Sequence, residues 1–134
     1  MPGVVGYLIY VNMGDGCLIS KYGNTASNNL FTEAAVRIQD TELDSLAGQS
    51  KDSFVGRYLV TWIEGLTGSD TATAHLIIRP NSDAEHKYNL FWYDVSKANK
   101  ILYYGQGMLY GDILIAAYWS PDAHKALDPG GPKF

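Results

Sequence analysis

The chain has 134 residues, the size of one ordinary domain and too short for two. Hydrophobic residues make up 46% and charged residues 18%, which excludes a disordered chain, and the ten tyrosines favour β-strands. The formal net charge is −4 and the ten lysines and arginines are scattered singly, so no basic stripe is present to neutralise a phosphate backbone. We therefore expect one domain over residues 1–134 and no nucleic-acid partner.

The cysteine content and the N-terminal residues indicate the compartment. Cys17 is the single cysteine, which excludes an intramolecular disulfide and favours a reducing environment. The first 16 residues have no positively charged region, the apolar run within them covers only 4–11, and no segment of the chain approaches transmembrane length. Pro2 excludes N-myristoylation. These features predict a cytoplasmic protein that does not associate with a membrane.

The N-terminal residues predict a β-hairpin. Two strand-like runs, 4–13 and 17–23, are joined across Gly14-Asp15-Gly16, and Asp-Gly is a strong signal for a tight hairpin turn.

Residues 24–53 allow two interpretations. Residues 32–48 could form a helix, with apolar residues loosely spaced and Gly48 as a stop, or they could contain a strand, because Ala34, Val36 and Ile38 share one face at period two. We favour a strand at 33–39 followed by a short helical turn within 40–47.

The remainder of the chain reads as a series of strands. Breaks rich in Gly, Pro, Asn, Ser and Asp separate the runs, and none is long enough for a crossover helix, so neighbouring strands should be antiparallel. The tail 120–134 is polar and contains Pro and Gly, and we expect it to lie on the surface or to be partly disordered. The strand-like runs are 54–63, 71–79, 86–95, 100–109 and 112–119.

The alternation of side chains predicts which face is buried. In the run 71–79 the even-numbered residues are apolar and most odd-numbered ones are polar, so the even residues should face the core. A meander of seven or eight such strands is expected to close into a barrel, since closure removes exposed edges. The fold class is therefore all-β, an antiparallel up-and-down barrel, with a sandwich as the alternative.

Aromatic residues are expected to gather at one end of this barrel. Pairing residues across each turn sets Trp62 opposite Ala72, and Ala72 opposite Trp92. Because Ala72 and Ala74 leave volume beside these rings, this end could admit a small apolar or aromatic molecule. The alternative is that the rings simply fill the barrel. The candidate ligand-binding residues are Tyr58, Trp62, Trp92, Tyr104 and Tyr118.

A second group of large side chains falls on the outer face. Together they form more apolar surface than a small monomer usually exposes, so either residues 24–53 or a second copy of the chain should cover them. This group predicts a homodimer interface made of Phe91, Tyr93, Ile113, Ile115 and Trp119.

The glycines at 105, 107 and 111 do not form a nucleotide site. A dinucleotide fingerprint needs a third glycine at position 110, which is Tyr110, and a helix after it, whereas a strand-like run follows. Gly105 and Gly107 share one face beside Leu90 and Tyr88, where a larger neighbour can lie over them.

Metal, cofactor and catalytic signals are weak. His75, His86 and His124 lack the spacing that brings two ligands to one ion, so we expect no metal site and no cofactor. Asp94 lies at a strand end near tyrosines, and partial burial could raise its pKa and suit it to acid-base chemistry, but such carboxylates usually cap turns. We expect no catalytic residue.

One pattern is similar to a known family. Gly56, Tyr58 and Trp62 form G-x-Y-x-x-x-W, and G-x-G-x-x-x-G-D-x-L closes the series from Gly105 to Leu114. Residues 54–119 therefore resemble small calycin-type, lipocalin-like barrels, although lipocalins carry G-x-W on their first strand. The resemblance implies a barrel that binds a small hydrophobic molecule, and it carries over no individual ligand contact.

Three functions follow as hypotheses. The leading one is a non-enzymatic barrel that binds a small apolar or aromatic ligand at its aromatic end. The second is a homo-oligomeric interaction or structural module that uses the outer apolar face. The third is an isomerase or hydrolase that uses Asp94 and a tyrosine.

Overall fold

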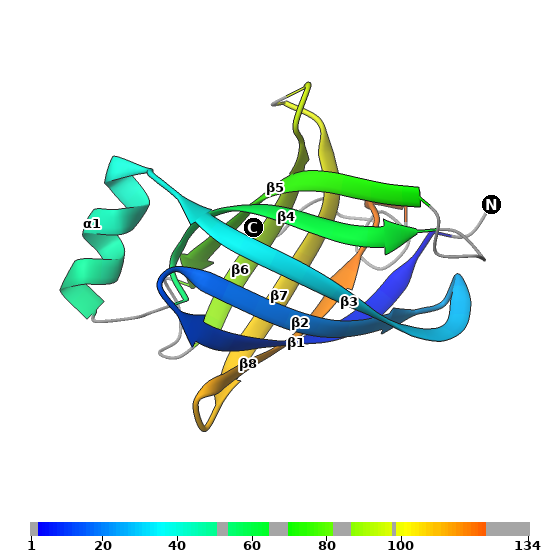
Figure 1. Cartoon of the computed structure of the whole chain (residues 1–134), viewed down its shortest axis with the longest axis horizontal. Coiled ribbons are helices and arrows are strands. Elements are labelled where there is room, and N and C mark those ends of the chain that lie inside the picture. The colour runs from blue at the N-terminus through cyan, green and yellow to red at the C-terminus, as the bar shows by residue number, and fades with distance from the viewer. Residues whose placement is uncertain (1–2, 51–53, 65–69, 82–86, 98, 123–134) are drawn as a thin grey trace.

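Eight antiparallel strands follow one another around a closed barrel, and the last strand pairs with the first (Figure 1). The computed structural model describes residues 3–50, 54–64, 70–81, 87–97 and 99–122. The predicted all-β meander barrel is confirmed, and the strand count is eight. The elements are β1 (Val5–Gly14), β2 (Cys17–Asn24), β3 (Ser27–Ile38), α1 (Thr41–Ser50), β4 (Gly56–Glu64), β5 (Asp70–Pro80), β6 (Lys87–Asp94), β7 (Ile101–Tyr110) and β8 (Ile113–Trp119).

Two tight turns follow the predicted chemistry. Asp15 and Gly16 both have positive φ, 53° and 78°, as a type I′ hairpin between β1 and β2 requires. Gly111 has φ of 63° in the turn between β7 and β8, a conformation that glycine adopts without steric cost.

The middle of the chain contains both a strand and a helix. The predicted strand at 33–39 is confirmed as part of β3, which begins earlier, at residue 27, and the predicted helical turn is confirmed as part of α1. Asp40 begins the helix, because its Oδ1 accepts a hydrogen bond from the Leu43 amide at 3.0 Å.

The predicted side-chain parity is confirmed. The even-numbered residues of β4, β5 and β6 face the barrel interior, which includes the fully buried Tyr58, Leu76 and Leu90. The predicted pairing of Trp62 with Ala72 is also confirmed. Trp92, however, lies opposite Leu76 and not opposite Ala72. Parity fixes the face of a residue but not its partner, so a shift of four residues preserves the pattern.

Gly105 and Gly107 lie opposite Leu90 and Tyr88, as predicted. A Cβ added at Gly105 would stand 3.0 Å from the Trp92 ring and 2.9 Å from the Ala117 carbonyl oxygen. These glycines therefore let large inward-facing neighbours and β8 approach the backbone of β7 closely.

One end of the barrel is covered by α1, and we refer to it as the closed end (Figure 1). Leu43 and Ala47 of α1 belong to the same buried core as Phe54 and Val55. Three arginines of the barrel strands make ion pairs with this region: Arg57 with Asp40 at 3.6 Å, Arg37 with Asp44 at 3.9 Å and Arg79 with Glu42 at 2.6 Å.

The large outer side chains are left without cover by residues 24–50. β3 lies in the wall between β2 and β4, and α1 lies at the closed end, so this part of the proposed covering segment does not lie over β6 or β8. The alternative that the middle segment covers this surface is therefore wrong for its described part, and residues 51–53 lie outside the described residues. Across the described ranges, no helix is both long and apolar enough to cross a membrane.

Candidate functional site

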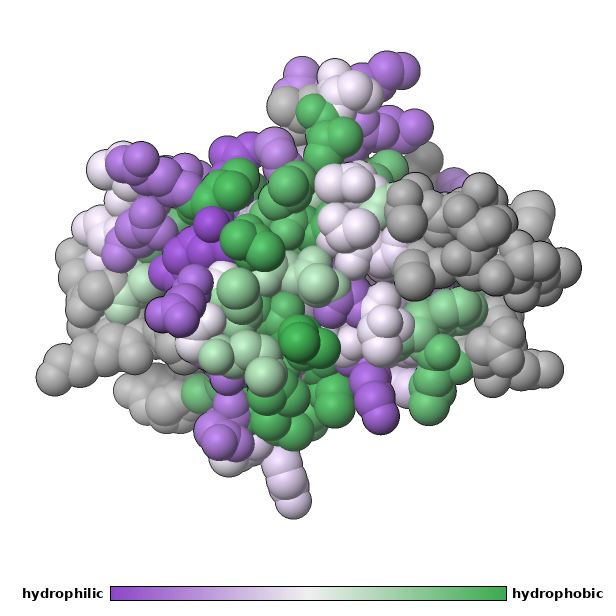
Figure 2. Space-filling model, in the orientation of Figure 1, coloured by the Kyte–Doolittle hydropathy of each residue, from purple (hydrophilic) through white to green (hydrophobic). Residues whose placement is uncertain are grey.

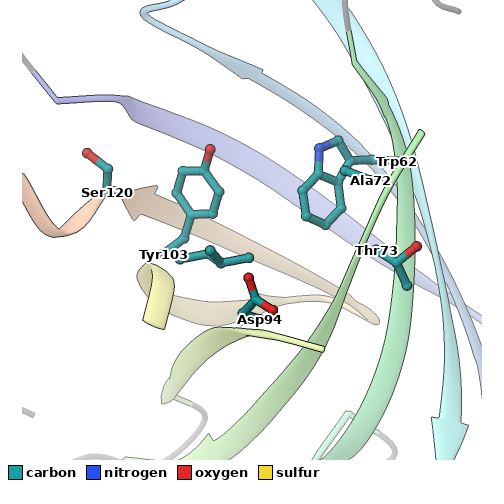
Figure 3. A pocket seen from close by; sticks show the side chains of 7 residues that line it. Trp62, Ala72, Thr73, Asp94, Tyr103 and Ser120 are labelled. Atoms are coloured by element: carbon teal, nitrogen blue, oxygen red, sulfur yellow. The ribbon is translucent and has the colours of Figure 1, made fainter. Parts of the chain in front are cut away.

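A pocket of about 400 Å³ opens at the end of the barrel opposite α1, and we call it the mouth pocket (Figure 3). The rings of Trp62 on β4 and Tyr103 on β7 project into the same space from two sides, with the carboxylate of Asp94 between them. A volume of this size suits a small organic molecule. The pocket is lined by Trp62, Ala72, Thr73, Asp94, Leu102, Tyr103 and Ser120.

Further aromatic rings lie behind this lining. Tyr103 packs edge-on against Tyr118, with ring centroids 5.6 Å apart, and Tyr118 packs against Trp92 at 5.9 Å and Tyr22 at 6.3 Å. Asn24 donates a hydrogen bond from Nδ2 to the Tyr118 hydroxyl at 3.0 Å. Burial raises the pKa of Tyr118 to about 12, so this hydroxyl is neutral and serves as a hydrogen-bonding group.

A carboxyl group lies inside the barrel next to these rings. Glu33 on β3 is only 6% exposed, and its cross-strand partners are Ser20 on β2 and Trp62 on β4. Tyr10 on β1 lies opposite Ser20 and donates a short hydrogen bond from its hydroxyl to Glu33 Oε1. Since cross-strand partners on one face are close neighbours, these four side chains form a continuous band around one side of the barrel interior.

The protonation of Glu33 follows from this position. Burial raises the pKa of Glu33 from 4.5 to about 7, although the hydrogen bond from Tyr10 and the nearby polar groups of Trp92 and Ser20 act in the opposite direction. Burial and the neighbouring Glu33 raise the pKa of Tyr10 well above its ordinary value. The pair therefore contains one group that changes charge near neutral pH and one that stays protonated.

Ser20 is the incompletely satisfied member of this band. It is 1% exposed, and its Oγ makes no hydrogen bond of ordinary geometry to any residue in the described ranges, although it lies close enough to Glu33 to lower the pKa of that carboxyl. A buried hydroxyl without a partner is costly, so it marks a position where a further polar group would be accepted.

Asp94 has a different environment. Its Oδ1 accepts hydrogen bonds from the Ser96 hydroxyl at 2.7 Å, the Ser96 amide at 2.8 Å and the Lys97 amide at 3.2 Å. The Ser96 hydroxyl, followed by the Ser96 amide, lowers the pKa of Asp94. The expectation of a raised pKa is therefore wrong, because this carboxylate caps the turn after β6 even though it also borders the pocket.

The sequence-predicted ligand residues are divided among three places. Trp62 lines the mouth pocket, while Trp92 and Tyr118 lie behind it. Tyr58 lies toward the closed end, where its hydroxyl donates to the Phe54 carbonyl at 2.8 Å and accepts from Arg37 Nη2 at 3.0 Å. Tyr104 is on the outer face, with its ring 6.2 Å from that of Phe91.

The sequence-predicted interface residues all lie on the outer face and are half-buried, but they form two groups. Phe91 and Tyr93 have ring centroids 6.3 Å apart, and Trp119 lies next to them opposite Tyr104. Ile113 and Ile115 instead neighbour the outer residues of β1.

Sequence reasoning missed the buried polar band and the pocket ring Tyr103. The alternation of side chains along β3 was a usable signal for Glu33, because Glu33 and Ala35 both occupy odd-numbered positions and both face inward. Tyr103, and not Tyr104, faces inward because it shares the face of Gly105 and Gly107 and lies opposite Trp92 in the regular part of the β6–β7 pairing.

Metal ligands are not clustered in the structure that is described. In those residue ranges no group of three or more His, Cys, Asp or Glu side chains could hold an ion. His75 lies on the outer face near Arg57, and His86 and His124 lie outside the described residues, as does 123–134 of the tail.

Comparison of the chain with protein-family models, with curated proteins and with solved structures returns no match.

Proposed function

We propose that this protein is a non-enzymatic, lipocalin-like barrel that binds a small aromatic or apolar molecule in the mouth pocket. The observation that carries the proposal is a cavity of about 400 Å³ at one end of a closed barrel, with Trp62 and Tyr103 on opposite sides. Pockets in barrel mouths with an aromatic lining and a few polar groups are the usual form of a small-molecule site.

The enzymatic alternative through Asp94 has less support. The lowered pKa and the three hydrogen bonds to Oδ1 keep this carboxylate ionised and committed to its turn, which is unfavourable for a group that must exchange protons near neutral pH.

Two adjacent tyrosines provide a matched test. Tyr103 lines the pocket, and Tyr104 points to the outer face. Binding of fatty acids, retinoids and aromatic metabolites would be measured by intrinsic tryptophan fluorescence, and the best ligand by calorimetry. We expect Tyr103→Ala to weaken binding by about tenfold or more, since each buried aromatic contact contributes about 1.4 kcal/mol or more, and Tyr104→Ala to leave it within about twofold. Equal losses in the two variants, or no binding by the wild type, would reject the proposal.

A second candidate function is self-association through an outer apolar band that shares Ile113 and Ile115 with the interface predicted from the sequence but not Phe91, Tyr93 or Trp119. Outward residues of adjacent strands form a band across β8, β1, β2, β3 and β4, and Figure 2 shows a hydrophobic area over this side. Twofold association would bury this band against a second copy. Sedimentation velocity would compare wild type with Ile19→Lys. A monomeric wild type would remove this candidate. The band contains Ile9, Val11, Ile19, Ala34, Val36, Leu59, Ile113 and Ile115.

A further inference from the structure

The mouth half of the barrel interior is acidic and contains no basic side chain within the described ranges. Among the side chains whose burial the structure describes, Glu33 and Asp94 are carboxyl groups that face it. The inward-facing Arg37 of β3 lies toward the closed end, with its guanidinium 5.4 Å from the Tyr58 ring centroid and paired with Asp44. Lys100 lies close enough to Asp94 to lower the pKa of that carboxyl, whereas no cation acts on the pKa of Glu33, so Glu33 is the one of these two carboxyl groups that lacks a compensating positive charge.

The remaining walls of this half are aromatic. Trp62 and Tyr103 border the cavity, and Trp92 and Tyr118 lie behind them. The faces of such rings attract cations, most strongly where water is excluded. Carboxyl groups together with aromatic faces are the chemistry that recognises an ammonium group.

The aromatic lining leads from the cavity to the buried carboxyl group. Trp62 lines the cavity and is the cross-strand partner of Glu33. Trp92 packs against Tyr118 and also lies close enough to Glu33 to lower the pKa of that carboxyl. Glu33 does not line the cavity itself, but its cross-strand partner Trp62 does, so an ammonium group beside the Trp62 ring lies one side chain away from Glu33.

We propose that the mouth pocket binds a small aromatic amine, whose ammonium group makes an ion pair with Glu33 and donates a further hydrogen bond to the unpartnered Ser20 Oγ. This proposal rests on the proposed function, since it names the chemical class of ligand for the same pocket. An ammonium group has three donors and no acceptor, so it complements a carboxylate, a serine oxygen and the faces of aromatic rings.

The proposal makes binding depend on pH. Because burial raises the pKa of Glu33 to about 7, the carboxyl is mostly protonated at pH 6 and mostly ionised at pH 8. An amine remains protonated at both values, so its affinity should fall about tenfold from pH 8 to pH 6. The pKa of Tyr10 and of Tyr118 is raised and that of Asp94 is lowered, so these three groups keep their charge over this range. The other polar side chains around Glu33 are those of Ser20, Trp62 and Trp92.

Calorimetry with three matched probes tests the class of ligand: 2-phenylethylamine, 2-phenylethanol and 3-phenylpropionate. At pH 8 we expect wild-type protein to bind the amine about tenfold or more tightly than the alcohol, with the carboxylate weakest. Glu33→Gln, which keeps the size of the side chain, should reduce amine affinity to that of the alcohol. Asp112→Asn removes the same charge at an exposed turn near the closed end and should leave the preference unchanged.

The outcomes separate the two proposals. If the alcohol binds as tightly as the amine, or if Glu33→Gln keeps the preference, the amine assignment is wrong and the proposed function stands. If none of the probes and none of the broader ligand panel binds, both are wrong. Should Glu33→Gln fail to fold, the pH series on wild type decides: an amine affinity that does not change between pH 6 and pH 8 overturns the proposal.

Discussion

The two ends of the barrel use similar side chains for different purposes. At the closed end, the hydroxyl of Tyr58 has both a donor and an acceptor partner, and α1 contributes Leu43 and Ala47 to the core. At the mouth, Tyr103 borders a cavity, and Glu33 is buried with a pKa near neutrality. Polar groups that are fully paired stabilise a fold, whereas polar groups beside open volume remain available to a ligand.

The comparison also separates two kinds of charge. Each of the three arginines around α1 is paired with a nearby carboxylate. Glu33 has no cationic partner among the described residues, and its environment favours the neutral acid. At the closed end the positive charge that pairs with a carboxylate comes from arginines of the chain. In our proposal the ammonium group of the ligand supplies the positive charge that pairs with Glu33.

The largest expected effect on the free energy of unfolding comes from replacing one tyrosine at each end of the barrel by alanine. Tyr58→Ala should lower the free energy of unfolding by about 3–5 kcal/mol, because it empties a fully buried site and removes hydrogen bonds to Phe54 and Arg37. Tyr103→Ala should cost about 1–2 kcal/mol, since this ring is half-buried and already borders a cavity. Urea unfolding of both variants measures the difference.

Ligand binding is the second readout for this pair. Tyr103→Ala should lose ligand affinity and Tyr58→Ala should keep it at temperatures where the variant is folded. Equal destabilisation by the two substitutions would mean that the mouth is packed as tightly as the closed end.

The next effect concerns Glu33 and pH. The pKa of Glu33 is about 7 in the folded chain against 4.5 as the ordinary value, so the folded chain holds an extra proton between these pH values. Raising the pH through this window removes a proton that favours the folded state, and the Glu33 contribution to the free energy of unfolding falls by about 3 kcal/mol. Below pH of about 4.5 the contribution is fully present. Urea unfolding between pH 4 and pH 8 should show this fall in wild type and not in Glu33→Gln.

Two other groups are controls for that measurement. His75 has a lowered pKa, through desolvation and the nearby Arg57, so it acts in the opposite direction, but it is present in both proteins and cancels in the difference. Asp94 has a lowered pKa and contributes stability that is lost only as the pH falls through its folded pKa. Parallel curves for wild type and Glu33→Gln would show that Glu33 has an ordinary pKa.

The strands could be predicted from the sequence because local signals agree along the whole chain. The turn glycines and the period-two alternation fixed the strand order and the buried face, and the hairpin at Asp15 and Gly16 has the expected positive φ values. The position of Trp92 was wrong by four residues, because side-chain parity cannot distinguish registers that differ by an even number.

The site was harder to predict because it depends on register and closure. Glu33 and Tyr10 are 23 positions apart in sequence, and only the pairing of β1 with β2 and of β2 with β3 brings them together. The placement of Tyr103 opposite Trp92 follows from the same register that sets Gly105 opposite Leu90, so the alternation along β7 already contained this signal. Dimer formation, ligand binding and the cytoplasmic location remain predictions.

The smallest expected effect on the free energy of unfolding comes from Gly105 in the wall of the barrel, which lies against Trp92. Gly105→Ala would place a Cβ 2.9 Å from the Ala117 carbonyl oxygen and 3.0 Å from the Trp92 ring, and the backbone oxygen has little freedom to move. We expect overpacking to lower the free energy of unfolding by about 1–3 kcal/mol. This loss exceeds the roughly 0.4–1 kcal/mol that alanine adds by reducing the conformational entropy of the unfolded chain. Gln106→Ala, at the next, exposed position of β7, should stay within about 0.5 kcal/mol. Because Trp92 lowers the pKa of Glu33, its displacement should shift the pH window of Glu33 upward, whereas a purely local strain would leave that window unchanged.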